Sequence, residues 1–481
     1  MAILAIDQGT SATKALVVGD GGAVLSAAEV PVRIATTTCG AAEQDPEELW
    51  DSVLAAGRQA MVLADEPLAA VGLANQGETV LAWDRSTGKP LSAAISWQDR
   101  RAATLCAELS AHAQFLQEIT GLPLDPYFSA PKMRWLRQRV TGDGVCTTTD
   151  SWLLHRLGAA FVTDAATASR TLLLDLDGMT WSAEACACFA VDPGSLPRIV
   201  ACSEVVGETS AFGKSIPIAG LAVDQQAALF AQGCRAPGEA KCTYGTGAFL
   251  MATVGPQRCR SRSGLAVCVA WQKGRETTYC LDAQVYTVGA AVTWLQRLGL
   301  IREPADLDAV AAGVQTAGGA MFIPALTGLA APFWRPHARG AFLGLSLATG
   351  PAHLVRAVID GIAAQVAWLA RAMGDDLGRA LTRLRVDGGL TRSRLLMQTQ
   401  ADLLQVPVEV YQSPHATALG VAAFARVGLG GTEDVADLFG PLTPAAVYEP
   451  RTSAEEAEER LVTWRGAAQA TMDLGAVTSD Q

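Results

Sequence analysis

The stretch that decides the fold reads Asp-Gln-Gly-Thr-Ser-Ala-Thr-Lys at residues 7–14, directly behind the apolar run at residues 2–6. An apolar run of this length ahead of a glycine predicts a buried strand that enters a tight turn. Residues 15–18 are apolar again and predict the returning strand. Glycine lets backbone N–H groups approach a phosphate, and the carboxylate of Asp7 can hold a hydrated magnesium ion. The stretch therefore predicts a phosphate-binding hairpin.

A second turn of the same type lies far along the chain. Residues 243–249 read Thr-Tyr-Gly-Thr-Gly-Ala-Phe and stand between the strand-like stretches 239–243 and 249–254. A single turn of this type does not distinguish a phosphate site from an ordinary hairpin. An aspartate in a turn also often bonds the turn's own backbone. Two of them in one chain indicate a duplicated domain, with a nucleotide held in the cleft between the copies.

Length and composition favour a two-domain enzyme of the cytoplasm. The chain of 481 residues is long enough for two or three domains, and 50% of it is hydrophobic, which excludes a disordered chain. The net charge of -11 argues against nucleic acid or an anionic membrane as a partner. We also expect no membrane-spanning segment, because no apolar run reaches the necessary length and no basic, signal-like prelude opens the chain.

The cysteines indicate a reducing compartment. There are eleven of them, an odd number, and none forms a Cys-x-x-Cys pair. This pattern favours reduced thiols in a cytosol over a disulfide framework or a zinc site.

Two longer motifs carry a resemblance to a known family. Residues 127–135 read Tyr-Phe-Ser-Ala-Pro-Lys-Met-Arg-Trp, and residues 340–345 read Gly-Ala-Phe-Leu-Gly-Leu and continue to 353–360. In this order, and together with both hairpins, they resemble the signatures of the FGGY carbohydrate kinases over nearly the whole chain. Within that family, further stretches are most similar to the glycerol kinases, namely 75–79, 95–101, 220–228 and 325–334.

The resemblance implies an α/β fold with two RNase H-like domains, as in actin, Hsp70 and the sugar kinases, and a nucleotide cleft between them. Strands that alternate with helices between residues 384 and 426 agree with sheets covered by helices. We expect an N-terminal domain over 1–232, with the polyol site and the first phosphate hairpin. A C-terminal domain over 233–481 would hold the nucleotide site and the second hairpin. We also expect a homodimer or a higher homo-oligomer.

Asp224 is the best candidate for a catalytic base. Transfer of a phosphoryl group to an alcohol needs a base for the hydroxyl proton. Asp224 follows the apolar segment 220–223, at the expected end of a strand, where a carboxylate can face a cleft. The matching aspartate has this role in the family. The residue can also simply cap a helix that begins at Gln225, and both interpretations can be true.

The resemblance implies the remaining site residues. Positions that match the polyol site of glycerol kinases are Gly77, Glu78, Trp97, Tyr127, Asp224, Gln225 and Phe249. Positions that match the nucleotide site are Thr10, Ser11, Ala12, Lys14, Thr246, Gly289, Thr293, Gly389 and Ser393. Each aromatic taken singly fits packing in the core better than a site, and only the joint match favours a site. ATP and Mg²⁺ are the implied cofactors, with Asp7 acting through a magnesium-bound water.

Two positions depart from the glycerol kinase pattern. Gly77 stands where those enzymes carry an arginine that grips substrate hydroxyls, and each hydrogen bond from such a donor contributes about 1.5–3 kcal/mol. Its loss weakens glycerol binding or enlarges the pocket, unless an arginine from another segment reaches in. Alternatively, Gly77 only provides a positive φ in the turn. Ser215 stands where enzymes inhibited by fructose 1,6-bisphosphate have an arginine, which argues against such regulation here.

The sequence therefore predicts ATP-dependent phosphorylation of a terminal hydroxyl of a small polyol, with glycerol as the first candidate. A longer polyol such as a tetritol, or a ketopentose such as xylulose or ribulose, stays open as the substrate. A non-catalytic ligand sensor on the same fold is a third interpretation. Asp7 and Asp224 argue against a sensor, because a sensor has no need for a general base.

Overall fold

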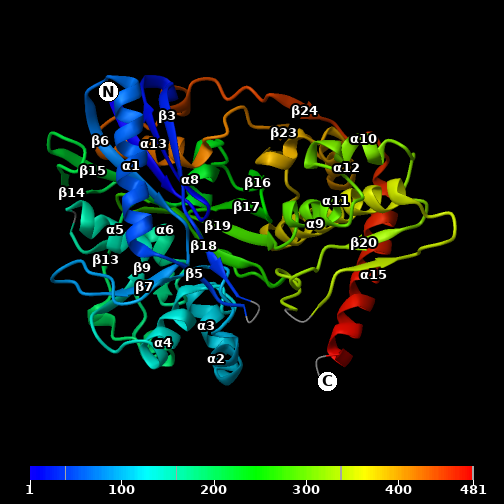
Figure 1. Ribbon diagram of the computed structural model, residues 1–481, viewed down its shortest axis with the longest axis horizontal. Coiled ribbons are helices and arrows are strands. Elements are labelled where there is room, and N and C mark those ends of the chain that lie inside the picture. Colours follow the sequence, from blue (N-terminus) through cyan, green and yellow to red (C-terminus); the bar gives the residue numbers. More distant parts are fainter. Residues whose placement is uncertain (38–39, 159, 336–337, 479–481) are drawn as a thin grey trace.

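The structure is a computed structural model and describes residues 1–37, 40–158, 160–335 and 338–478. Two large mixed sheets, each flanked by helices, form two halves of the molecule (Figure 1). The first half, blue to cyan, lies on the left of the view, and most of the second half, green to red, lies on the right. The predicted α/β class is confirmed.

The first sheet has six strands. From edge to edge these are β14 (Val205–Thr209), β15 (Ile216–Val223), β6 (Leu68–Asn75), β1 (Ala2–Gln8), β2 (Ala12–Val18) and β3 (Val24–Pro31). Leu4 packs in one core with α1 (Pro46–Ala64), whereas Ile3 packs in another core with α13 (Ala416–Gly428). Because helices cover both faces of the sheet, residues 2–6 of β1 are all apolar instead of alternating with polar residues.

The second sheet repeats the pairing of the first. Its strands are β18 (Ala266–Lys273), β19 (Glu276–Val285), β17 (Ala248–Gly255), β16 (Ala240–Tyr244), β22 (Leu384–Asp387), β23 (Val408–Val410) and β24 (Ala446–Tyr448). In the order β3-β2-β1-β6-β15, two antiparallel pairings are followed by two parallel ones. The order β19-β17-β16-β22-β23 has the same pattern. The topology therefore contains the duplication that the two hairpins predict.

Most of the smaller elements lie in the chain between β6 and β15. The short strands are β4 (Ala35–Thr36), β5 (Ala42–Gln44), β7 (Val80–Trp83), β8 (Ala94–Ile95), β9 (Val145–Thr148), β10 (Val162–Asp164), β11 (Leu174–Asp175), β12 (Thr180–Trp181), β13 (Arg198–Val200), β20 (Met321–Ile323) and β21 (Ala341–Leu343). The other helices are α2 (Ala103–Glu108), α3 (Ala113–Thr120), α4 (Ser129–Arg139), α5 (Thr149–Leu157), α6 (Ala165–Ala168), α7 (Ala183–Cys188), α8 (Asp224–Ala231), α9 (Gly289–Arg297), α10 (Leu307–Ala311), α11 (Pro351–Leu377), α12 (Arg394–Leu404), α14 (Val435–Phe439) and α15 (Ala454–Thr478).

Helix α13 comes from the second half of the sequence and packs on the first sheet, beside β6 and β15 (Figure 1). Arg426 near its end binds the start of the chain. The guanidinium donates to the carboxylate of Asp20 at 2.7 Å and to the carbonyl oxygen of Met1 at 2.9 Å. The chain therefore returns to the first half before it adds the last strand, β24, to the second sheet. The division into 1–232 and 233–481 stays a prediction.

Helix α11 is long and apolar enough, by length and composition, to cross a membrane. The helix is nevertheless no uninterrupted apolar run, because Arg356, Asp360 and Arg371 lie within it, so it does not contradict the expectation from the sequence. In the structure, 67% of its most apolar window is buried, and the helix packs against α12, α15 and β20. Buried core helices pass the same test of length and composition, and α11 lies in the core.

The described cysteines are all free thiols. They number ten, and most of them are buried. Cys39, the eleventh, lies outside the described residues. Among the described residues no cluster of three or more His, Cys, Asp or Glu side chains could hold a metal ion. Both observations agree with the interpretation of the cysteines as reduced thiols.

Candidate active site

The first predicted phosphate turn lies between β1 and β2. The N–H of Gly9 donates to the carbonyl oxygen of Ala12 at 3.1 Å, which closes the turn. The hydroxyl of Thr10 accepts from the indole N–H of Trp97 at 2.8 Å and donates to Oε1 of Gln76 at 3.1 Å. The turn is thus fixed to two other segments of the first half.

The second turn lies between β16 and β17 and contacts the start of α9. The N–H of Gly289 donates to the carbonyl oxygen of Gly245 at 3.1 Å. A Cβ atom on Gly289 would lie 2.5 Å from that oxygen, so only glycine lets the helix begin this close to the turn. The first N–H groups of α9 are therefore bonded to carbonyl oxygens of the turn, which ties the start of the helix to the turn.

A small cavity of about 160 Å³ joins both turns. Thr10 and Ser11 of the first turn and Thr246 of the second contribute to its wall. All the predicted polyol-site residues line it as well, and these are Gly77, Glu78, Trp97, Tyr127, Asp224, Gln225 and Phe249. The structure thus brings together residues that are scattered over most of the chain.

Asp224 lies at the junction of β15 and α8, on the wall of this cavity. The helix begins at Asp224 itself, so the interpretation of this residue as the cap of a helix starting at Gln225 is wrong. Its Oδ1 still accepts from the N–H of Gln225 at 2.7 Å. Burial raises the pKa of Asp224, although the ammonium group of Lys241 acts in the opposite direction. A carboxylate with a raised pKa is better suited to accept a proton near neutral pH.

Asp7 lies near the end of β1, close enough to Asp224 for the charge of Asp224 to change the pKa of Asp7. Burial, and after it the charge of Asp224, raise the pKa of Asp7 to about 7. Lys14, the partner of Asp7 in the β1–β2 register, lowers the pKa. Two carboxylates are thus held near each other, an arrangement that a bound cation would stabilise.

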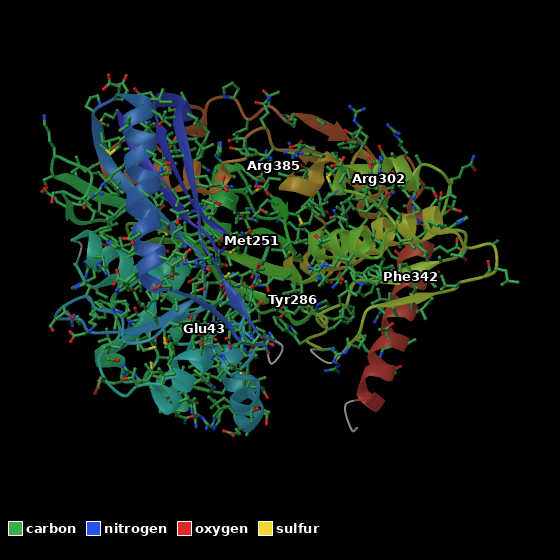
Figure 2. The ribbon with its side chains drawn as sticks, viewed as in Figure 1. Glu43, Met251, Tyr286, Arg302, Phe342 and Arg385 are labelled. Atoms are coloured by element: carbon green, nitrogen blue, oxygen red, sulfur yellow. The ribbon has the colours of Figure 1, made fainter. Side chains whose placement is uncertain are left out.

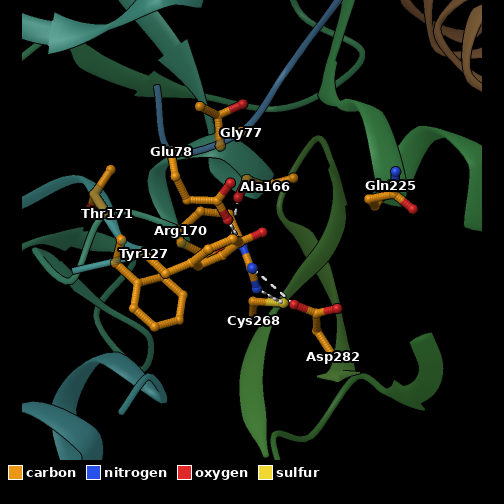
Figure 3. Close-up of polar contacts among 12 residues, drawn as sticks. Gly77, Glu78, Tyr127, Ala166, Arg170, Thr171, Gln225, Cys268 and Asp282 are labelled. Carbon is orange, nitrogen blue, oxygen red and sulfur yellow. Dashed lines mark hydrogen bonds and ion pairs between the residues drawn. The ribbon is translucent and has the colours of Figure 1, made fainter. Parts of the chain in front are cut away.

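Arg170 also lines this cavity, although the sequence analysis does not name it. Its Nε donates to Oε1 of Glu78 at 2.6 Å, and its Nη2 lies 2.8 Å from Oδ2 of Asp282 (Figure 3). All three side chains are buried and line the cavity. Burial opposes the charge of Arg170, but the two carboxylates outweigh it and raise its pKa well above the ordinary value. The predicted alternative, that an arginine from another segment reaches the place near Gly77, fits Arg170.

The turn that holds Gly77 does contain a residue with positive φ, but this is Glu78, at 60°. Among the described residues, Gly77 is not one of those with a positive φ. The interpretation of Gly77 as a residue required for a positive φ is therefore wrong. In Figure 3 Gly77 lies beside Glu78 at the edge of the site, while Gln225 comes from the opposite side on α8.

Aromatic rings form another wall. The ring of Trp97 lies edge-on to those of Tyr127 and Phe249, with centroids 5.8 Å away in both cases. The buried ammonium group of Lys132 donates to the carbonyl oxygens of Pro126, at 3.1 Å, and of Tyr127. Lys132 thereby fixes the backbone that carries Tyr127. The aromatics therefore act as part of the site as well as of the core.

The other predicted nucleotide residues lie outside the small cavity: Ala12, Lys14, Gly289, Thr293, Gly389 and Ser393. A neighbouring cavity of about 370 Å³ includes Thr246, Gly247 and Tyr286. Tyr286 lies near the centre of the molecule (Figure 2), and the guanidinium of Arg100 from the first half is 5.9 Å from its ring. Ser393, expected on the adenine side, is buried, caps α12 and donates to Asp308.

Comparison with known proteins identifies the family. The FGGY family of carbohydrate kinases matches with its N-terminal domain over residues 2–231 and with its C-terminal domain over residues 240–429. The chain belongs to the FGGY family of carbohydrate kinases. The glycerol kinase of Alkalilimnicola ehrlichii is 43% identical over 97% of both chains. That of Bordetella parapertussis is 42% identical over 97% of this chain and 96% of its own.

Solved structures agree. The crystal structure of Plasmodium falciparum glycerol kinase with ADP matches with a TM-score of 0.91 and 31% identity over 98% of both chains. The ligand-bound xylulose kinase of Lactobacillus acidophilus has a TM-score of 0.88 but only 22% identity over 99% of this chain and 98% of its own, and shares the fold alone. This FGGY kinase is therefore a phosphotransferase that uses ATP, and the sensor interpretation is set aside.

Proposed function

We propose that this kinase transfers the γ-phosphoryl group of ATP to a terminal hydroxyl of a small polyol, and that glycerol is its substrate. The observation that carries the proposal is the cavity of about 160 Å³, which both phosphate turns and Asp224 share. Its small volume favours a compact acceptor. The names of the relatives that are more than 40% identical over nearly the whole chain support glycerol in particular.

In this proposal Asp224 accepts the proton of the attacking hydroxyl, and Gln225 contacts a neighbouring hydroxyl. Glu78 and Arg170 orient the other hydroxyls through their charged oxygen and nitrogen atoms. Trp97, Tyr127 and Phe249 then cover the C–H face of the polyol and exclude water. Positioning and a dry site are the main contributions that a protein makes to phosphoryl transfer.

The nucleotide phosphates would lie against the backbone N–H groups of the two turns, with Thr10, Ser11 and Thr246 as additional donors. Mg²⁺ would be held mainly by the phosphates and by water, with Asp7 bound to one of these waters. This fits the described residues, among which no cluster of three acidic, histidine or cysteine side chains could hold a metal. Magnesium commonly binds in this way and neutralises phosphate charge when bound. Asp7 and Asp224 supply the nearby carboxylates.

Three further expectations stay proposals. The boundary near residue 232 is supported by the two family matches, which end at 231 and begin at 240. A cytoplasmic location is supported by the free thiols of the described cysteines. The homo-oligomer is a prediction from the sequence alone.

A longer polyol is the second candidate substrate. The wall of the cavity at Gly77 has no side chain of its own, and no hydrogen-bond donor comes from that position. A tetritol could place an additional carbon and hydroxyl near this wall if Val223, which lies against Gly77, moved aside. Ketopentoses such as xylulose or ribulose are further candidates of this kind.

A substrate panel tests the proposal. The purified protein is incubated with ATP and Mg²⁺ and with glycerol, erythritol, xylulose or ribulose, and release of ADP is measured. We expect the highest kcat/KM for glycerol and little release without an acceptor. Erythritol as the best substrate would select the second candidate, and acceptor-independent release of ADP would contradict both.

A further inference from the structure

Two cysteines lie behind the arginine of the substrate site. Cys268 of β18 and Cys280 of β19 are direct partners in the antiparallel register, and their sulfur atoms are 3.5 Å apart. Both side chains are fully buried. Among the described residues they are the one pair of cysteines whose sulfurs are in hydrogen-bond contact. The polyol chemistry proposed above uses neither of them.

The backbone of this pair has the geometry that a disulfide needs. Residues directly opposite each other in an antiparallel pair have Cα atoms about 4.5–5.5 Å apart, and disulfides span Cα distances of about 4.4–6.8 Å. The sulfurs would have to approach by about 1.5 Å to reach the bonding distance. Side-chain rotation can provide this without moving the strands.

Arg170 connects Cys268 to the substrate site. Its Nη1 lies 3.5 Å from the sulfur of Cys268, while Nε and Nη2 of the same guanidinium bind Glu78 and Asp282 (Figure 3). The hydrogen bond from Cys280 lowers the pKa of Cys268. Burial raises this pKa, and the charge of Arg170 lowers it further. A thiolate beside a guanidinium is the reactive form of cysteine.

We propose that Cys268 and Cys280 form a redox-modification site, in which hydrogen peroxide oxidises the pair to a disulfide and thereby weakens polyol binding. The Cys268 thiolate attacks one peroxide oxygen, so that an S–O bond forms and the O–O bond breaks. The Cys280 sulfur then attacks the sulfenic sulfur, and the S–O bond breaks as the S–S bond forms. The two thiols lose two electrons and two protons, and the peroxide becomes two molecules of water.

The consequence for the site follows from the three contacts of Arg170. In the disulfide, the sulfur of Cys268 is drawn toward Cys280 and no longer accepts from Nη1. The guanidinium then loses one of the contacts that hold it between Glu78 and Asp282. Because Arg170 and Glu78 orient the substrate hydroxyls in the proposed function, oxidation should raise KM for the polyol more than it lowers kcat.

Two side chains connect the sulfur of Cys268 to the substrate cavity. Arg170 and Gln226, whose side-chain nitrogens lie 3.5 and 3.7 Å from the sulfur of Cys268, both line the substrate cavity. The sulfur is therefore one side chain behind the cavity, where a molecule as small as hydrogen peroxide can approach. A bound polyol fills the cavity and should slow the oxidation.

Peptide mapping tests the site without any assay of activity. The intact protein is treated with hydrogen peroxide, its remaining thiols are blocked, and disulfides are identified by mass spectrometry. We expect a link between Cys268 and Cys280 that a dithiol reductant reverses and that Cys280→Ser abolishes. Cys242→Ser is the matched control, because Cys242 is equally buried in a strand, and it should leave the link unchanged. Loss of thiols elsewhere first, with no such link in folded protein, would overturn the proposal.

Kinetics test the effect, which rests on the proposed function. In oxidised protein KM for the best acceptor of the panel should rise at least about tenfold, the change expected when one charged hydrogen bond is weakened. Cys280→Ser should keep its KM under the same treatment. A mapped disulfide with unchanged KM would overturn the regulatory effect. If no acceptor is phosphorylated, the proposed function fails, while the mapping still decides whether the disulfide forms.

Discussion

Gly77 and Val223 lie against each other on the wall of the substrate cavity: a Cβ atom placed on Gly77 would be 2.7 Å from Cγ2 of Val223. A contact this short does not occur between real side chains. The place where a side chain of residue 77 would begin is therefore occupied by the isopropyl group of Val223. The resemblance to glycerol kinases implies an arginine at position 77, and Val223 blocks one here.

The first prediction concerns this pair. Gly77→Arg alone should destabilise the protein by about 1–3 kcal/mol, the usual cost of overpacking. The double variant Gly77→Arg/Val223→Gly should fold normally, and its kcat/KM for glycerol should rise about tenfold to a hundredfold, because the new guanidinium can bond the hydroxyls. Thermal unfolding and the substrate panel measure the two effects.

Val223→Gly alone is the control, since it opens the cavity without adding a donor. It should not improve glycerol use, and it should favour a tetritol. Equal changes for all acceptors in the double variant would mean that position 77 does not determine specificity. Full stability of Gly77→Arg alone would show that Val223 is no obstacle.

The second prediction concerns the buried cluster of Arg170, Glu78 and Asp282. Arg170→Met removes the cation and leaves two buried carboxylates without their cationic partner, although Asp282 keeps the hydrogen bond from Gln284. Breaking a buried ion pair in this way costs about 3–5 kcal/mol, and we expect a loss of this size in urea unfolding. Arg170→Met/Glu78→Gln should recover part of the loss, because it removes one of the uncompensated charges. Arg33→Met breaks the exposed pair with Glu48 and should leave the free energy of unfolding nearly unchanged.

Local patterns predicted the parts of the fold that depend on local chemistry. Residues 2–6 are apolar throughout because helices cover both faces of the sheet, and this pattern together with the glycine turn marks the first hairpin. Ser393 precedes α12 and caps it, as a serine at this place indicates. The same residue shows the limit of a family match, because its hydroxyl is engaged with Asp308.

Contacts between distant segments could not be predicted. Arg170 and Glu78 are 92 residues apart and meet only because α6 ends beside the turn after β6. No local periodicity marks either residue. The packing of α13 on the first sheet could not be predicted either. Its small apolar residues favour close packing but do not indicate which element they pack against. The motifs therefore predicted residues that the structure brings together around one cavity, whereas Arg170, which also lines this cavity, was missed.

The third prediction concerns Asp224 as the base. Asp224→Asn keeps the shape of the side chain and the hydrogen bond from the N–H of Gln225, but it removes basicity. Turnover should fall about 10²–10⁴-fold, the usual contribution of general base catalysis, while ADP binding measured by calorimetry stays the same. Asp192→Asn is a matched control, because Asp192 also accepts a backbone N–H, that of Gly194, and does not line the cavity. Near-normal turnover of folded Asp224→Asn would contradict the role of Asp224.

The fourth prediction uses a buried acid outside the cavity. Asp150 in α5 accepts from the hydroxyl of Thr163 at 2.6 Å, and burial, followed by the charge of Asp164, raises its pKa from 3.8 to about 6. A carboxyl group whose pKa rises on folding destabilises the protein above the folded pKa, because its charged form is disfavoured there. This cost disappears as the pH falls from about 6 to below 3.8, where the group is protonated in both states.

Asp150→Asn should therefore stabilise the protein at pH 8, by about 3 kcal/mol at most for a shift of this size. The stabilisation should shrink as the pH falls and be small near pH 4, because Asp150 of the folded wild type is then neutral and that of the unfolded chain is partly protonated. Urea unfolding of both proteins between pH 4 and pH 8 measures the difference. Thr163→Val is a useful control, since it removes the hydrogen bond to the carboxylate but no titrating group. A stability difference between Asp150→Asn and wild type that does not change with pH would mean that Asp150 titrates at its ordinary value.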